Sequence, residues 1–285
     1  MTTTTHFFSR SGEPTLRYSL HLPSDAPRGA VLLTHGYAEH SGRYQEVVDA
    51  LVARGLAVAT HDLRGHGHSE GPRGYVERFD DYVRDARALL DHLATDPTWK
   101  AAGKPVLMGH SLGGLVTFLL ALDLGDRVSG VVLSSPFFGL SLPVPAPKKM
   151  AARLLSKVAP RFALPSGLHG RDLTHDARLA AAYDADPMLV QRVPSRWFTE
   201  ATGAQEQSLA RAPSWTLPLL MLVAGDDRVA SAPATRSLFA RIPAAPDRQI
   251  EVLEGQFHEI FNELDRAKFI ATAADRAAEF AARSR

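Results

Sequence analysis

Apolar runs alternate with amphipathic stretches along most of this 285-residue chain. Near-continuous apolar runs are typical of strands that lie buried in a parallel sheet, and they occur at residues 30–34, 56–60, 106–108, 131–134 and 217–223. Residues 15–21 alternate with a period of two, which predicts an early antiparallel strand. Helical spacing is found at residues 44–54, 79–93, 112–124 and 263–283. The alternation predicts an α/β protein with a mostly parallel sheet and helices on both faces.

One long segment interrupts this alternation of strands and helices. From residue 137 to residue 214 the pattern contains no clear strand, and the segment is too long for an ordinary connection. We expect an inserted cap at 137–214, on a core made of residues 1–136 and 215–285.

Within this predicted cap, Met150, Leu154, Val158 and Phe162 recur at a helical spacing of four, and basic residues stand between them. Such a helix can lie on an anionic lipid surface. The alternative is a helix that packs on the core and turns its basic face to solvent.

Composition narrows the function classes. Lys and Arg number 32 against 31 Asp and Glu, so the net charge of +1 gives no reason to expect a nucleic-acid partner. The absence of cysteine excludes disulfides, thiol nucleophiles and cysteine-ligated zinc. The N-terminus has no secretory pattern, and the most apolar stretch, 115–122, is much shorter than the roughly 20 residues that span a bilayer. We expect a cytoplasmic protein that associates at most peripherally with a membrane.

The strongest chemical signal is the sequence Gly-His-Ser-Leu-Gly at 109–113, between an apolar strand and an apolar helix. Small residues on both sides permit a sharp turn that presents the hydroxyl of Ser111 at the helix N-terminus. A serine nucleophile needs a histidine base and an orienting carboxylate, in the chain order serine, acid, histidine. His258 lies before the final predicted helix and suits the base. Asp226 and Asp227 both follow the strand at 217–223, so their position in the sequence leaves open which of them is the orienting carboxylate.

Two backbone amides are candidates for an oxyanion hole. The amide of Leu112 follows the nucleophile, and the amide of Tyr37 lies in the loop after the strand at 30–34, where Gly36 permits a close turn.

Residues 61–69 gather three histidines and an aspartate, which could suggest a metal site. Their glycines and the absence of helical His-x-x-x-His pairing favour a structural loop instead. We expect no metal and no organic cofactor.

Taken together, six stretches carry a resemblance to a known family: HGYAEHSGRY at 35–44, DLRGHGHS at 62–69, GHSLGG at 109–114, LSSP at 133–136, DRV at 227–229 and EGQFHE at 254–259. The chain resembles the monoacylglycerol lipase and lysophospholipase branch of the α/β-hydrolase fold. The resemblance implies that fold with an inserted cap, and a triad of Ser111, Asp227 and His258, since Asp227 precedes Arg-Val as the family acid does. It also implies that the amides of Tyr37 and Leu112 form the oxyanion hole. Polar residues near the glycerol end of the substrate would be Glu39, Arg43 and Tyr183.

These residues predict a serine hydrolase that cleaves a lipid ester in two acyl-transfer steps, with monoacylglycerol as the favoured substrate. A lysophospholipase and a broader carboxylesterase or thioesterase are the alternatives with the same triad. A non-catalytic binding protein on this scaffold is a remoter alternative, because such proteins usually lose a triad residue. Epoxide hydrolase and dehalogenase chemistry is disfavoured, since those relatives carry Asp where this chain has Ser111.

Overall fold

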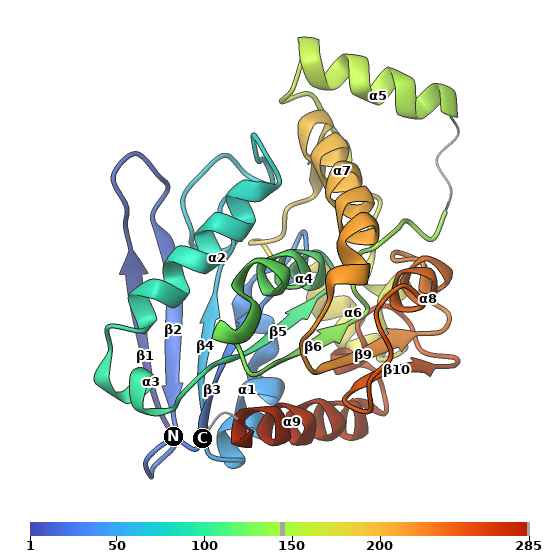
Figure 1. Ribbon diagram of the computed structural model, residues 1–285. Helices are drawn as coiled ribbons and strands as arrows, with labels where there is room; N and C mark the ends of the chain where they lie inside the picture. The colour runs from blue at the N-terminus through green and yellow to red at the C-terminus, as the bar shows by residue number, and fades with distance from the viewer. Residues whose placement is uncertain (143–145, 284–285) are drawn as a thin grey trace.

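A twisted sheet of eight strands forms the centre of the molecule (Figure 1). The computed structural model describes residues 1–142 and 146–283, without the side chains of residues 146, 148 and 149. The strand order is β1-β2-β4-β3-β5-β6-β9-β10. The strands are β1 (Thr2–Phe8), β2 (Leu16–Leu22), β3 (Gly29–Thr34), β4 (Leu56–His61), β5 (Val106–His110), β6 (Gly130–Ser134), β9 (Leu219–Ala224) and β10 (Arg248–Leu253). β2 pairs antiparallel with β1 and β4, and the remaining neighbours pair parallel, which confirms the predicted class.

Strand β1 has no counterpart among the predicted strands. Its sequence is a run of threonines without apolar alternation, and its residues are almost entirely exposed. β-branched threonine favours extended backbone, and Thr3 and Thr5 add side-chain hydrogen bonds of 3.0 Å to His21 and Ser19 on β2. Hydrogen bonding to β2 therefore forms this edge strand without burial of an apolar face.

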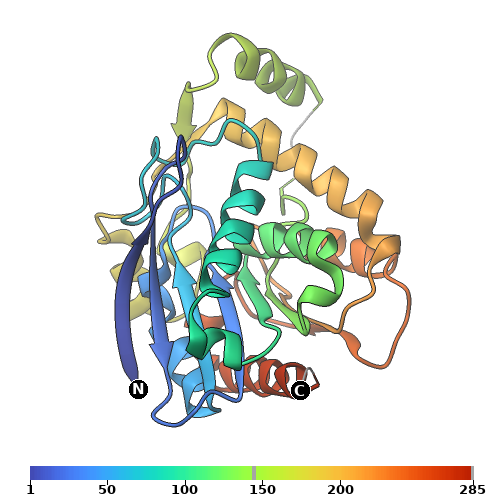
Figure 2. The same ribbon diagram turned by 60° about the vertical axis from the view of Figure 1, so that its left-hand side comes forward.

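Helices cover both faces of the sheet (Figure 2). Helices α1 (Gln45–Ala53) and α9 (Arg266–Ala282) pack on one face, and α2 (Asp80–Leu93), α3 (Pro97–Ala101), α4 (Leu112–Leu124) and α8 (Ala232–Phe239) pack on the other. Short 3-10 turns are η1 (Ser41–Tyr44), η2 (Gly125–Arg127), η3 (Gly170–Asp172), η4 (Ala212–Ser214) and η5 (Ile260–Asn262). In the described part of the chain, no helix is long and apolar enough to cross a bilayer.

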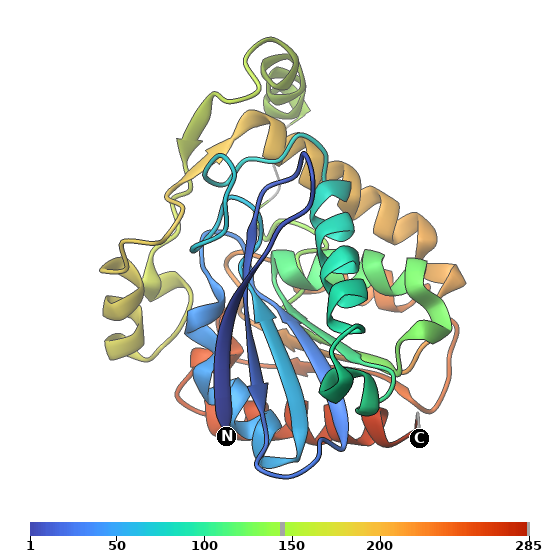
Figure 3. The same cartoon turned by 90° about the vertical axis from the view of Figure 1, so that its left-hand side faces the viewer.

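The chain between β6 and β9, which we call the β6–β9 segment, lies over one edge of the sheet (Figure 3). It contains α5 (Ala146–Val158), β7 (Ala163–Pro165), α6 (Ala177–Asp184), β8 (Arg192–Pro194) and α7 (Ser195–Arg211). The expectation that this segment has no strand was wrong, because β7 and β8 pair antiparallel. Each is three residues long, too short for a hydrophobic period to be visible. Helix α5 stands farthest from the sheet and packs on α7.

The last helix begins later than predicted. It starts at Arg266 rather than at Glu263, whose side chain is buried in the loop between β10 and α9. The Glu263 carboxylate accepts a 2.9 Å hydrogen bond from the Phe257 amide and lies 2.8 Å from Nδ1 of His175. Glu263 therefore holds the loop that carries His258.

Candidate active site

The turn between β5 and α4 places Ser111 in an unusual backbone conformation. Its φ of 52° and ψ of −118° lie in the region that disfavours a side chain. A Cβ at Gly109 would lie 2.4 Å from the Gly113 carbonyl oxygen, and a Cβ at Gly113 would lie 2.2 Å from the Thr34 carbonyl oxygen. Glycine is required at both positions because Gly109 packs against the first turns of α4 and Gly113 packs against the end of β3. The predicted sharp turn is present.

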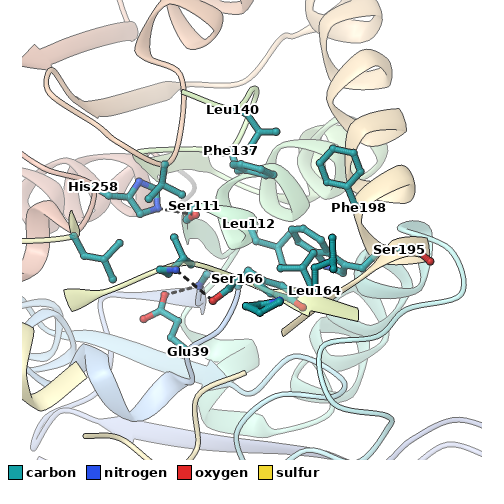
Figure 4. A pocket seen from close by; sticks show the side chains of 18 of the residues that line it. Glu39, Ser111, Leu112, Phe137, Leu140, Leu164, Ser166, Ser195, Phe198 and His258 are labelled. Carbon is teal, nitrogen blue, oxygen red and sulfur yellow. Dashed lines mark hydrogen bonds between the residues drawn. The ribbon is translucent and has the colours of Figure 1, made fainter. Parts of the chain in front are cut away.

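The side chains of Ser111, His258 and Asp227 form one hydrogen-bonded chain (Figure 4 draws the first two). Nε2 of His258 lies 2.8 Å from Oγ of Ser111, and Nδ1 lies 2.7 Å from Oδ2 of Asp227. The other oxygen of Asp227 accepts hydrogen bonds from the amides of Val229 and Ala230, at 2.7 and 2.8 Å. Because the carboxylate faces Nδ1, that nitrogen carries the proton and Nε2 is free to accept one from the serine.

Asp226 has a different environment. Its side chain is exposed, and its backbone amide donates to the Gln256 carbonyl oxygen at 3.0 Å. The structure therefore brings Asp227, and not Asp226, against His258.

His258 is buried, and burial opposes its protonation. The carboxylate of Asp227 outweighs that effect, with further help from Glu259 and Glu39, so the pKa of His258 is raised above its ordinary value. The neighbouring His110 behaves in the opposite way, since burial and the proximity of His258 lower its pKa to about 4. Of these two adjacent imidazoles, His258 is the one that can take a proton near neutral pH.

Tyr37 and Leu112, whose amides are predicted for the oxyanion hole, line the same cavity as Ser111. The Leu112 amide begins α4, where the helix dipole favours negative charge. The Gly36 amide, one residue before Tyr37, is already used, because it donates to Oε1 of Glu39 at 2.6 Å. Within residues 1–142 and 146–283, neither the Tyr37 nor the Leu112 amide is a donor in the backbone hydrogen bonds that lie outside regular helices and strands.

A cavity of about 550 Å³ opens above Ser111 (Figure 4). Its wall is mostly apolar and comes largely from the β6–β9 segment, including Leu155, Phe162, Leu164, Trp197 and Phe198. Polar side chains in the lining include those of Glu39, His110, Tyr183 and Glu259. Glu39, Tyr183 and Glu259 all contact Arg43, so these polar groups gather at one end of the cavity, and the rest of its wall is mostly apolar.

Of the residues expected at the polar end, Glu39 and Tyr183 line the cavity, whereas Arg43 lies behind them. The Arg43 guanidinium sits 4.7 Å from the centre of the Tyr183 ring. It also forms a bidentate ion pair with Glu259, at 2.6 and 2.8 Å. The sequence indicated no role for Glu259, although this residue directly follows His258. Its partner Arg43 is 216 residues away in the chain, so no local pattern indicates the contact.

The loop after β3, which carries Tyr37, is also joined to the β6–β9 segment. The Tyr37 hydroxyl donates to the Arg192 carbonyl oxygen at 2.8 Å, and the Val190 amide donates to the Ala38 carbonyl oxygen at 3.0 Å. Nε2 of His40 lies 2.9 Å from a carboxylate oxygen of Asp186.

The histidine-rich loop at 61–69 is held together by Asp62. Its carboxylate accepts hydrogen bonds from the Ser41 amide and hydroxyl, at 2.9 and 2.6 Å, and from the His68 amide at 2.9 Å. Burial opposes its charge, but these bonds and His35 lower the pKa of Asp62 to about 2. Among the residues described, no group of three or more His, Asp or Glu side chains is arranged to hold a metal ion. The loop has the structural arrangement that its glycines favour.

Similarity to known proteins agrees with this fold. Residues 25–265 match the family described as serine aminopeptidase, S33. The chain is 34% identical over 260 residues to a monoacylglycerol lipase of Mycolicibacterium smegmatis, covering 90% of this chain and 91% of the relative. It is 30% identical over 246 residues to the phospholipase YtpA of Bacillus subtilis, covering 85% and 92%. The crystal structure of the Paleococcus ferrophilus monoacylglycerol lipase superimposes with a TM-score of 0.83 at 28% identity, over 94% of this chain and 99% of that one. The chain therefore belongs to the serine aminopeptidase S33 family of serine hydrolases with the α/β-hydrolase fold.

Proposed function

We propose that this protein is a serine esterase that hydrolyses monoacylglycerols to a fatty acid and glycerol. The observation that carries the proposal is the 2.8 Å contact between Ser111 and His258 in a cavity with a mostly apolar wall and a polar end. The similarity to a monoacylglycerol lipase along 90% of the chain supports the same substrate class.

In the proposed reaction His258 takes the proton of Ser111 while the serine oxygen attacks the ester carbonyl carbon. The amides of Tyr37 and Leu112 stabilise the negative oxygen of the tetrahedral intermediate. His258 then gives its proton to the departing glycerol oxygen, which leaves an acyl-serine. Water, deprotonated by His258, attacks the acyl-serine. His258 then gives that proton to the oxygen of Ser111 as the second tetrahedral intermediate breaks down, which releases the fatty acid and the free serine. Asp227 orients the imidazole and stabilises its charged form.

We further propose that residues 137–214 act as a cap on a core of residues 1–136 and 215–285. The apolar wall contributed by the β6–β9 segment suits an acyl chain. At the polar end, Glu39 and Tyr183 are placed to contact the glycerol hydroxyls, and Arg43 supports both from behind.

Helix α5 supports a transient contact with a lipid surface. Met150, Leu154 and Val158 follow one another at a spacing of four and are 71%, 64% and 71% exposed. Arg153, Lys157 and Arg161 are exposed nearby, so an anionic membrane is the surface that this face fits.

A lysophospholipase is the second candidate, because a relative that matches 85% of this chain is named a phospholipase. The two are separated by fatty-acid release from a monoacylglycerol, from a lysophospholipid of the same acyl chain and from a short-chain ester. Ser111→Ala serves as the inactive control. Fast release from the monoacylglycerol alone supports the proposal, whereas preference for the lysophospholipid contradicts it. Activity on only the short ester would retain the triad and refute a lipid substrate.

A further inference from the structure

A chain of buried ion pairs connects two loops that are distant in sequence. Nη1 of Arg43 lies 3.1 Å from Oε2 of Glu39 and 2.6 Å from Oε1 of Glu259, and Nη2 lies 2.8 Å from Oε2 of Glu259. Glu39 and Glu259 are only 3% and 5% exposed. The guanidinium therefore bridges two buried carboxylates, a role for which its planar shape suits arginine better than lysine.

Each carboxylate is fixed to a part of the proposed catalytic machinery. Glu39 accepts the amide of Gly36, which precedes the oxyanion residue Tyr37, at 2.6 Å. The Tyr44 hydroxyl donates to the same oxygen at 2.6 Å. Glu259 directly follows the base His258, and Asn262 donates to its second oxygen at 2.8 Å. The two ends of the chain of ion pairs are thus the oxyanion loop and the loop of the general base.

Arg43 is poorly placed to bind a substrate head group. Both of its terminal nitrogens are occupied by carboxylates, and it lies behind the residues that line the cavity. We propose that Arg43, Glu39 and Glu259 are positioning residues. Together they fix the position of the oxyanion loop relative to the loop that carries the base. This inference rests on the proposed esterase function. It assigns Arg43 and Glu259 to the chemical step rather than to recognition of glycerol, and it gives Glu39 a positioning role in addition to its proposed contact with glycerol.

The same arrangement has an electrostatic consequence for the base. Two carboxylates share one guanidinium, so the chain of ion pairs leaves negative charge near His258. Burial raises the pKa of Glu259, but the interaction with Arg43 outweighs burial and lowers this pKa to about 2. The Glu259 carboxylate therefore stays charged. The charged and titratable groups that act on His258 are Asp227 from the loop after β9, His110 from the end of β5, Glu39 from the loop after β3, and Glu259 from its own loop. Arg43 is paired with both glutamates. Removal of the Glu259 charge should make the imidazole harder to protonate.

The test compares the variants Glu259→Gln and Arg43→Lys with wild type on two esters of one fatty acid, a monoacylglycerol and a methyl ester. The methyl ester lacks the glycerol hydroxyls, so only a defect in the chemical step affects both substrates. We expect kcat to fall about 10- to 100-fold for both esters, as misplacement of catalytic groups does, with KM nearly unchanged. In Glu259→Gln, the acidic limb of kcat/KM should also move to lower pH. The double variant should be no worse than the poorer single variant, because both changes break one chain of contacts.

Glu254→Gln is the matched control, since it removes an exposed carboxylate from the same region of chain and should change none of these quantities. Thermal unfolding verifies that each variant is folded. Both variants keep hydrogen-bonding groups in place, so they avoid the unpaired buried charge that an apolar replacement would leave.

A loss confined to the monoacylglycerol, or a rise in KM with unchanged kcat, would overturn the proposal and make these residues a glycerol site. Wild-type kinetics in both folded variants would overturn it as well. Labelling of Ser111 by a fluorophosphonate separates this outcome from failure of the proposed function. If wild type is labelled but cleaves neither ester, the lipid substrate is wrong, and slower labelling of the two variants would still support the positioning role.

Discussion

At the scale of single residues, the backbone of Ser111 combines function with strain. A φ of 52° with a ψ of −118° costs a residue with a Cβ about 1–3 kcal/mol. The conformation persists because β5 and α4 are both buried and fix the two ends of the turn. The serine hydroxyl is thereby held toward His258 without a side-chain rearrangement.

This strain predicts an unusual order of stabilities. Ser111→Gly should unfold at a higher temperature than Ser111→Ala, with a free energy of unfolding larger by roughly 1 kcal/mol after the entropy cost of glycine. Both variants lose the hydroxyl, so neither should release fatty acid. Equal or reversed stabilities in thermal unfolding would show that the turn carries no strain at this residue.

The two adjacent aspartates predict a second contrast. Asp227→Asn should lower kcat by about 10⁴-fold, because an amide at this position favours the wrong histidine tautomer. Asp226→Asn should stay close to wild type, since that side chain is exposed. Steady-state hydrolysis by the two folded variants measures the difference. A larger loss in Asp226→Asn would refute the assignment of the acid.

Local sequence was sufficient to predict the sharp turn at Ser111 and insufficient to predict the contacts around it. The nucleophile turn is encoded within five residues, 109–113, because its glycines are demanded by contacts with the adjoining strand and helix. The choice of Asp227 depended on a family pattern, since neighbouring aspartates look alike in sequence. The contact between Arg43 and Glu259 joins residues 216 positions apart, and no local sequence pattern predicts it.

At the scale of elements, burial decided which segments could be predicted. Strands such as β3 and β9 are buried along their whole length and appear as apolar runs. Strand β1 is exposed, and β7 and β8 are three residues long, so no hydrophobic period marks them. Helix α5 was predicted from its spacing, but spacing alone cannot say whether its apolar face meets protein or solvent. In the structure, Leu154 and Val158 are exposed.

The exposure of Leu154 and Val158 predicts that α5 contributes to binding of lipid surfaces. Replacement of Leu154 and Val158 by serine should weaken binding to anionic phospholipid vesicles by more than about tenfold, since two side chains lose their apolar contact with the acyl region. Hydrolysis of a water-soluble short ester should not change. Vesicle co-sedimentation measures binding, and Phe7→Ser provides the control, because Phe7 is an exposed apolar side chain on β1. Equal binding by the variant and wild type would contradict a role for this face.

At the scale of the whole molecule, buried histidines couple stability to pH. Burial lowers the pKa of His61 and of His66 to about 3, and that of His110 to about 4. Nδ1 of His61 and Nε2 of His66 are buried and have no hydrogen-bond partner among the described residues, so nothing there stabilises an added proton. The folded protein keeps these imidazoles neutral, whereas the unfolded chain protonates them below its pKa of about 6.5.

Stability should therefore fall as the pH drops below about 6.5 and should continue to fall until the folded-state values of 3 to 4 are reached. Each such histidine contributes up to about 1.4 kcal/mol per pH unit, so the three together approach about 4 kcal/mol per pH unit. The raised pKa of His258 works in the opposite direction and reduces the slope. Urea unfolding between about pH 7 and pH 5 measures the effect. A free energy of unfolding that is independent of pH would contradict it.

The contacts between the Tyr37 loop and the β6–β9 segment also bear on how this protein can change through evolution. The hydrogen bond between His40 and Asp186 and the bond from Tyr37 to the Arg192 carbonyl oxygen tie the Tyr37 loop to the segment that lines most of the cavity. A segment inherited from a relative would arrive without its matching partners in that loop. A recombinant that exchanges substrate specificity should therefore be active only when residues 36–40 and residues 186–197 are transferred together. Substitutions at positions 40 and 186 should also be correlated among relatives.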